Sequence, residues 1–318
     1  MPRTIEHGAM AAARSGLEAL LRSNVFAVTA ESVPPLSCDP DAIVASAADL
    51  KGHADAVNVT ESPAAHVHVA PLGAAKLLLD AGIEPVLQVT TRDRNRLALQ
   101  ADLLAAAALG IRNILCLRGD DPSAGDQPEA KPVFDLDARD LIETAARMRD
   151  KGELPSGRAI AHPPALVIGA SDIPVDPQPG WEPKGLAAKR AAGADFVQTQ
   201  FCFDLGVIER YIARLKEAGL VPSLPLLVGI GPIPSAASAR WMRDKLWGVA
   251  VPDAVIARLE RARDSRAEGR RLCIELLQAL KEMPGVAGAH LMAPRMREEL
   301  PAIIEESGVR RGRPPGFA

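Results

Sequence analysis

Eight short apolar segments, separated by helical patterns, recur along the chain of 318 residues. They cover residues 26–31, 55–60, 85–90, 113–120, 165–171, 195–200, 224–231 and 285–293. Their nearly continuous apolar character is typical of strands that are buried on both faces, as in a parallel sheet. Eight strand–helix repeats in about 290 residues predict a single-domain (β/α)8 TIM barrel over residues 24–308, rather than a doubly wound sheet.

Three segments lie outside this alternation. Residues 1–23 predict an N-terminal extension or helix, and residues 309–318 predict a basic, flexible tail. A helix-rich insert at about 252–281 precedes the last strand, and we expect it to pack across the barrel or to form an oligomer contact. Two irregular loops, 121–134 and 172–183, follow the fourth and fifth strands, at the barrel face where active sites form.

Composition excludes several classes of protein. A net charge of −3 and a pI near 6.1 argue against a basic nucleic-acid-binding face. The four cysteines form no CxxC motif, which favours buried, reduced thiols. Charges interrupt the N-terminal segment and no apolar run has the length of a membrane span, so we expect a cytoplasmic protein with no membrane partner. Only ten residues are aromatic, so the core must consist of Ala, Leu, Ile and Val.

The ends of the predicted strands present polar groups to one mouth of the barrel. They include Glu31, Thr60, Gln88, Thr90, Arg118, Gly119, Asp120, Ser171, Asp172, Gln198, Gln200, Gly229, Gly231 and, just beyond the last strand, Arg295. Burial at an apolar mouth raises the pKa of a carboxyl such as Glu31, which suits a general acid; a solvated strand-end charge is the alternative. His66 and His68 have no carboxylate ligands nearby in the sequence, so no metal site is predicted.

Three further motifs are less specific. The Gly229-x-Gly231 pair lacks the third glycine of a dinucleotide fingerprint, and either a phosphate contact or a tight turn explains it. Lys189 is equally compatible with a phosphate or ribose contact and with a solvated surface. The Arg-Gly-Asp run at 118–120 ends an apolar strand, which disfavours an adhesion motif, and Gly119 permits close approach of a ligand.

Several segments together resemble the methylenetetrahydrofolate reductase family over about residues 24–308. These segments are AES-x-PP at 30–35, VT at 59–60, LGIRNILCLRGDDP at 109–122, AGADFVQTQFCFD at 192–204 and GVAGAHLMAP at 285–294. The resemblance implies a (β/α)8 barrel that passes a hydride from NAD(P)H through FAD to 5,10-methylenetetrahydrofolate and forms 5-methyltetrahydrofolate. It also implies a folate and a nicotinamide nucleotide as partners, and an assembly of identical chains.

The resemblance implies a role for each matching residue. Glu31 falls on the catalytic glutamate, which protonates the bridged folate so that its five-membered ring opens to an iminium. Asp120 falls on the aspartate between flavin and folate that tunes both electrostatically. Gln200 matches the glutamine that orients the folate, and Arg295 lies near a folate-contacting arginine. The flavin-contacting positions are matched by Thr60, Arg118, Gly119 and Lys189.

The chain also departs from the family pattern. Gln88 replaces a histidine on the third strand, Ala170 replaces a tyrosine on the fifth, and a phenylalanine expected near Ala237 is missing. Gln88 and Ala170 still occupy cofactor-binding positions. These departures leave open a flavin-free or reverse-running folate oxidoreductase. A non-catalytic folate-binding accessory subunit is a further alternative, against which the shared presence of Glu31, Asp120 and Gln200 argues.

Overall fold

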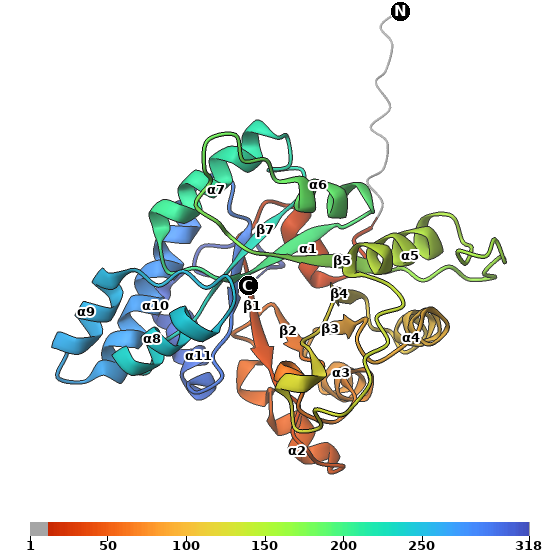
Figure 1. The fold of residues 1–318 in the computed structure, drawn as a ribbon, viewed down its shortest axis with the longest axis horizontal. Coiled ribbons are helices and arrows are strands. Elements are labelled where there is room, and N and C mark those ends of the chain that lie inside the picture. The colour runs from red at the N-terminus through yellow and green to blue at the C-terminus, as the bar shows by residue number, and fades with distance from the viewer. Residues whose placement is uncertain (1–11, 318) are drawn as a thin grey trace, which may run out of the picture.

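The fold is a closed barrel of eight parallel strands surrounded by helices, in a computed structural model that describes residues 12–317 (Figure 1). The strands are β1 Ala27–Ser32, β2 Ala56–Val59, β3 Pro85–Thr90, β4 Asn113–Leu117, β5 Val167–Asp172, β6 Phe196–Phe201, β7 Leu226–Ile230 and β8 Gly288–Leu291. Each strand pairs with its neighbour in sequence, and β8 closes the barrel by pairing in parallel with β1. The prediction of a (β/α)8 barrel is confirmed.

The helices alternate with these strands along the chain. They are α1 Gly16–Arg22, α2 Pro40–Ala45, α3 Pro71–Asp80, α4 Arg96–Ala108, α5 Ala138–Asp150, α6 Lys184–Ala191, α7 Leu205–Glu217, α8 Ala236–Lys245, α9 Asp253–Arg261, α10 Ser265–Glu282 and α11 Leu300–Ser307. Short 3-10 turns, η1 Ala48–Leu50, η2 Pro63–Ala65, η3 Pro122–Ala124 and η4 Arg297–Glu299, lie in the connections. Most of the α-helices begin at a Ser, Asp or Asn whose side chain accepts from a first-turn N–H.

Side chains point alternately to the two faces of each strand, and this separates an outer core beneath the helices from an inner core within the barrel. In β1, Val28 and Ala30 belong to the core between the barrel and the helices, whereas Ala27 packs inside the barrel. Phe196 from β6 fills this interior, and Gly169 on β5 leaves it room, since a Cβ at position 169 would lie 2.5 Å from the Phe196 ring. Side chains at the lower end of the strands therefore fill the barrel, as in other barrels of eight parallel strands.

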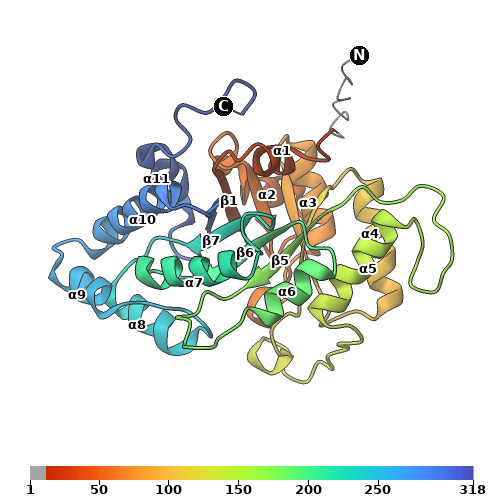
Figure 2. The same ribbon diagram turned by 90° about the horizontal axis from the view of Figure 1, so that it is seen from above.

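Helix α1 covers the amino ends of the strands (Figure 2). Leu17, Leu20 and Leu21 are buried and pack with the interior residues Ala27 and Phe196. Glu84 holds the start of the helix in place, because its carboxylate accepts from the backbone N–H of Gly16 and Leu17. The part of the predicted 1–23 extension that the structure describes is therefore a helix at the bottom of the barrel; residues 1–11 lie outside the described residues.

The C-terminal segment also lies at this lower end. The sequence predicts a basic, flexible tail from residue 309; in the structure Arg310 donates to the carbonyls of Gly52 and His53, and Phe317 packs against the interior cluster. Ala318 is outside the described residues. Arg313 pairs with Asp55, both side chains being 4% exposed, and donates to the carbonyl of Phe26 at 2.6 Å. The physical reason is that the basic tail meets an acidic partner at the start of β2.

The predicted insert at 252–281 corresponds to α9 and α10. Helix α10 packs against β7 and β8, so it occupies the position of a barrel helix as well as extending the connection. Helix α9 packs against both α8 and α10 (Figure 1). The connection between β7 and β8 therefore holds three helices, and α8 lies next to the mouth.

Two expectations about composition can be compared with the structure. No helix among residues 12–317 is both long enough and apolar enough to cross a membrane. All four cysteines are free; three are buried, as expected, but Cys38 is exposed in the connection between β1 and α2.

Candidate active site

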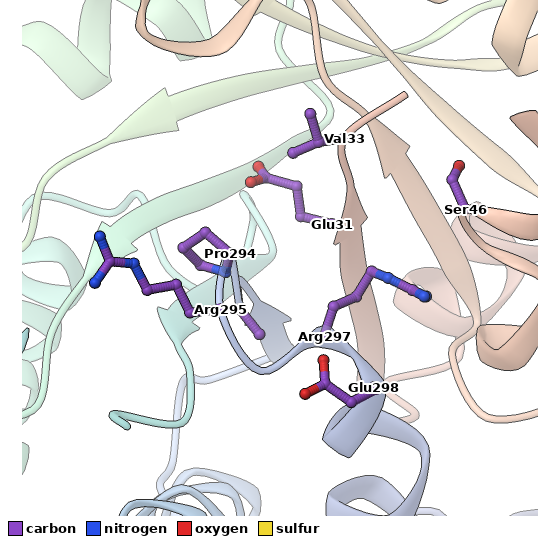
Figure 3. A pocket seen from close by; sticks show the side chains of 8 residues that line it. Glu31, Val33, Ser46, Pro294, Arg295, Arg297 and Glu298 are labelled. Carbon is purple, nitrogen blue, oxygen red and sulfur yellow. The ribbon is translucent and has the colours of Figure 1, made fainter. Parts of the chain in front are cut away.

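A cavity of about 420 Å³ lies at the carboxyl ends of β1 and β8 (Figure 3). Its walls are Glu31, Val33, Ser46, Ala293, Pro294, Arg295, Arg297 and Glu298. Figure 3 shows Glu31 beside Pro294, with Arg295 and Arg297 extending away to either side. The structure thus brings two predicted site residues, Glu31 and Arg295, to the same cavity.

Glu31 points inward from β1 and is the acidic group at the inner end of this cavity. Its side chain is 22% exposed, and its Oε2 accepts from Gln88 Nε2 at 3.4 Å. Burial raises the pKa of Glu31 to about 7, because the desolvation cost of the charged form exceeds the effect of the Gln88 hydrogen bond. A carboxyl with this pKa holds a proton that it can donate near neutral pH.

A buried polar network lies directly below Glu31, inside the barrel. Gln198 Nε2 donates to Asn58 Oδ1 at 3.0 Å and to Thr29 Oγ1 at 2.9 Å, and Gln198 Oε1 accepts from Asn58 Nδ2 at 2.6 Å. Thr29 Oγ1 lies 3.0 Å from His290 Nδ1, and His290 Nε2 lies 3.9 Å from Glu31 Oε2. The network therefore extends from the barrel centre up to the acid.

Gln198 is among the strand-end residues predicted at the mouth, whereas Thr29, Asn58 and His290 are not. Each of the three lies within a strand rather than at its end, and each is 3% exposed or less. The signal that could have found them is the two-residue period: on β8, Gly288 and His290 share one face, whereas Ala289 packs in the outer core.

A second, apolar slot adjoins the cavity. It has a volume of about 70 Å³ and is lined by Phe201, Pro232, Pro234, Ser238, Trp241, Met242, Leu246, Met292, Pro294 and Arg295. Pro294 and Arg295 line both spaces. A ligand bound at Glu31 can therefore extend along the β8 loop towards α8.

Asp120 and Gln200 lie outside the walls of this cavity. The Asp120 carboxylate accepts from the backbone N–H of Ala64 at 2.8 Å, which ties the loop after β4 to the loop after β2. Gln200 Oε1 accepts from the backbone N–H of Phe201 at 3.0 Å, next to an irregularity in the β6–β7 pairing. In this structure both side chains are engaged by the protein.

The residues expected to contact FAD make contacts within the protein. Ala170 is fully buried in the core between the barrel and the helices, because the β5 register turns Ser171, and not Ala170, toward the interior. Lys189 Nζ donates to the carbonyl of Ser171 at 2.5 Å, and Arg118 lies 4.1 Å above the Phe134 ring. The contact of Ala170 with the cofactor stays a prediction, and the burial of this side chain means that only the backbone at position 170 faces the mouth side of the strand end.

The other expected FAD positions are also closely packed. A Cβ at Gly119 would lie 3.0 Å from Arg92 Cβ and 3.1 Å from Thr90 Cβ. The missing side chain at position 119 therefore allows the segment after β4 to pack closely against the segment at the end of β3. Thr60 Oγ1 is buried without a hydrogen-bond partner, and Gln88 is bonded to Glu31. The unpaired Thr60 hydroxyl is a buried polar atom that a bound cofactor would satisfy.

No group of three or more His, Cys, Asp or Glu side chains between residues 12 and 317 is arranged to hold a metal ion. His66 is exposed, and its Nδ1 contacts the carbonyl oxygen of Ala64, two residues earlier.

The fold and this site define a class: a (β/α)8 barrel with a protonatable carboxyl at the carboxyl ends of its strands. The family model described as methylenetetrahydrofolate reductase matches residues 16–308, and the chain belongs to that family. A 5,10-methylenetetrahydrofolate reductase of Escherichia coli is 28% identical over 208 residues, which cover 64% of this chain and 63% of the relative.

Two further comparisons extend the similarity. A probable methylenetetrahydrofolate reductase (NADPH) of Caenorhabditis elegans is 26% identical over 241 residues, covering 74% of this chain but 34% of the relative, so the chain spans about a third of that protein. A protein from Clostridium thermocellum, described as binding two copies of 5-methyl-5,6,7,8-tetrahydrofolic acid, has a similar fold, with a TM-score of 0.60 and 14% identity. That alignment covers 92% of this chain and 98% of the other.

Proposed function

We propose that this protein reduces 5,10-methylenetetrahydrofolate to 5-methyltetrahydrofolate with hydride from NAD(P)H, and that Glu31 is the general acid. The observation that carries the proposal is the Glu31 carboxyl at the wall of a cavity of about 420 Å³, with its pKa raised to about 7 by burial. Membership of the reductase family supports the same reaction.

The chemistry requires an acid before the hydride arrives. Glu31 transfers its proton to the bridging nitrogen of the folate, the bond from that nitrogen to the one-carbon unit breaks, and its electron pair stays on the nitrogen. The other nitrogen then forms an iminium with the one-carbon unit. A hydride added to this carbon gives the methyl group and oxidises the nicotinamide nucleotide. An acid with a pKa near the working pH suits this step.

The two adjoining spaces fit the two ends of such a substrate. The Glu31 cavity supplies polar and charged groups for the pterin, whereas the slot beside Trp241 is apolar and suits a benzoyl ring in character, although at about 70 Å³ it must widen to admit one. Arg295 lines both spaces and is a candidate partner for a folate carboxylate. The present contacts of Gln200 and Asp120 use one oxygen of each side chain, which leaves the Gln200 amide N–H groups and the second Asp120 oxygen to contact the substrate.

The Glu31→Gln variant tests the acid role. Glutamine keeps the shape of the side chain and its hydrogen bonding but cannot transfer a proton, so we expect kcat to fall about 10²–10⁴-fold. NAD(P)H oxidation with 5,10-methylenetetrahydrofolate, followed at 340 nm, measures the effect. Glu209→Gln, on the exposed side of α7 and outside the walls of both spaces, is the matched control. An unchanged rate in Glu31→Gln would contradict the assignment.

The hydride can reach the folate by two routes. The family resemblance implies FAD as the carrier, whereas direct transfer from the nicotinamide is a second candidate. The burial of Ala170 and the protein contacts of Arg118 and Lys189 favour direct transfer. The visible spectrum of purified protein, before and after titration with FAD, distinguishes them: a bound flavin near full occupancy rejects direct transfer, and turnover without flavin supports it. Turnover by the isolated chain also excludes an accessory subunit.

A further inference from the structure

In the polar network below Glu31, the group that donates each hydrogen bond can be assigned by counting donors and acceptors. The Gln198 amide uses both of its N–H groups, one on Asn58 and one on Thr29. Thr29 Oγ1 is therefore an acceptor from Gln198, and its own proton must point elsewhere. The two available acceptors are His290 Nδ1 at 3.0 Å and the Ala289 carbonyl at 3.4 Å. The shorter contact is to the histidine.

This direction fixes the tautomer of His290. Burial lowers the pKa of His290 to about 3, so its ring is neutral near pH 7. A neutral imidazole that accepts at Nδ1 carries its proton on Nε2. That Nε2–H faces Glu31 Oε2 across 3.9 Å, and a movement of about 1 Å would bring the pair within hydrogen-bond distance.

We propose that His290 is a positioning residue for Glu31: its Nε2–H, held in that tautomer by Thr29 and Gln198, supports the Glu31 carboxylate after the proton has been transferred. The inference rests on the proposed function, since it assumes that Glu31 transfers a proton. His290 is 3% exposed and is not a wall of the cavity, so it acts through Glu31 and not on the substrate.

Other groups that face Glu31 limit what His290 can do. Gln88 Nε2 on β3 is a second donor to Oε2, at 3.4 Å. Arg295, Arg297 and Glu298, on the loop after β8, line the same cavity, and the two arginines extend away from Glu31 in Figure 3. Removal of His290 therefore leaves the carboxylate with one weak side-chain donor on the inner side.

The test compares His290→Leu with His290→Gln. Leucine removes the donor, so the charged form of Glu31 loses support; we expect the fall in kcat at high pH to move upward by about 0.5–1 pH unit. Loss of positioning should also lower kcat about 10-fold, with KM for the folate changed less than about 2-fold. Glutamine presents an amide N–H at the position of Nε2, and should restore the midpoint of the pH profile and most of kcat.

The outcomes separate this inference from the proposed function. If Glu31→Gln is inactive but His290→Leu has the wild-type pH profile and kcat, only the role of His290 is overturned. If Glu31→Gln keeps full activity, the proposed function itself fails. Should His290→Leu not fold, Thr29→Val and Thr29→Ser decide: an upward shift in the valine variant, and not in the serine variant, supports the inference, and no shift overturns it.

Discussion

Glu31 and His290 are neighbours in the barrel interior, and burial moves their pKa values in opposite directions. The pKa of Glu31 rises from 4.5 to about 7, and that of His290 falls from 6.5 to about 3. Both shifts favour the neutral form, because each group lies where water does not solvate a charge. The site therefore holds a protonated acid above a neutral histidine at slightly acid pH.

These two shifts predict how stability depends on pH. Between pH 4.5 and 6.5 the folded protein holds a proton on Glu31 that the unfolded chain releases, so this group lowers stability as pH rises. In the same window the unfolded chain holds a proton on His290 that the folded protein lacks, so this group raises stability as pH rises. The two slopes oppose each other and nearly cancel in the wild type.

Variants should reveal the cancellation. Relative to wild type, we expect the free energy of unfolding of Glu31→Gln to rise with pH from 4.5 to 7, with a total gain on the order of 3 kcal/mol. His290→Gln should instead show a free energy of unfolding that falls with pH between 4.5 and 6.5, relative to wild type. Urea denaturation at several pH values measures both. Variants whose pH dependence is the same as that of wild type would contradict the assigned pKa values.

At the scale of elements, the C-terminal segment contacts the start of β2, a contact that the sequence pattern does not predict. Arg313 forms two ion-pair contacts with Asp55, Nη1–Oδ1 at 2.6 Å and Nη2–Oδ2 at 2.8 Å. Asp55 Oδ2 also accepts from the backbone N–H of Val28 at 2.7 Å. One buried carboxylate thus joins the tail, the start of β2 and strand β1.

Arg313→Ala should destabilise the fold. Asp55 keeps a second cation, because Arg310 Nη2 lies 3.3 Å from its Oδ1, but it loses the two charge-assisted hydrogen bonds from Arg313, and we expect a loss of about 2 kcal/mol in the free energy of unfolding. Arg311→Ala is the matched control, because Arg311 is exposed and makes one weak contact, at 3.4 Å, with the Glu305 carbonyl. Chemical denaturation of both variants measures the difference, and equal stabilities would show that the Asp55 contact contributes little.

Elements were easier to predict than the faces they bury. In the segment 93–109 the spacing of Leu97, Gln100 and Leu104 predicts a helix, and α4 covers Arg96–Ala108. Leu97 is nevertheless 74% exposed, whereas Leu99 and Leu103 are fully buried. A helix rich in alanine and leucine has several candidate apolar faces, and only packing against the sheet selects one.

At the scale of the whole molecule, the barrel follows from the sequence because eight apolar runs with helices between them leave few other topologies. Glu31 and Arg295 were predicted from their places at strand ends and from the family resemblance, and both line the cavity. The burial of Ala170 in the outer core and the place of His290 beside Glu31 were not predicted, since a nearly continuous apolar strand does not reveal which of its two faces turns inward.

The mouth of the barrel joins segments that are distant in sequence, and Trp241 on α8 provides a test of how far the substrate site extends. Trp241 lines the apolar slot and is 53% exposed, whereas Trp247, six residues later, is 84% exposed and is not one of the slot's walls. If the slot holds the aromatic ring of the folate, Trp241→Ala should raise KM for the folate about 5–10-fold and leave kcat nearly unchanged.

Trp247→Ala removes an indole of the same size from the same end of the barrel without altering the slot, so it should leave KM within about 2-fold of wild type. Steady-state kinetics of the two variants, with the nicotinamide nucleotide saturating, measure the contrast. Equal values of KM in both variants would confine the substrate to the Glu31 cavity. A fall in kcat for Trp241→Ala would instead mean that the slot helps to align the one-carbon unit for hydride transfer, since ground-state binding alone changes KM and not kcat.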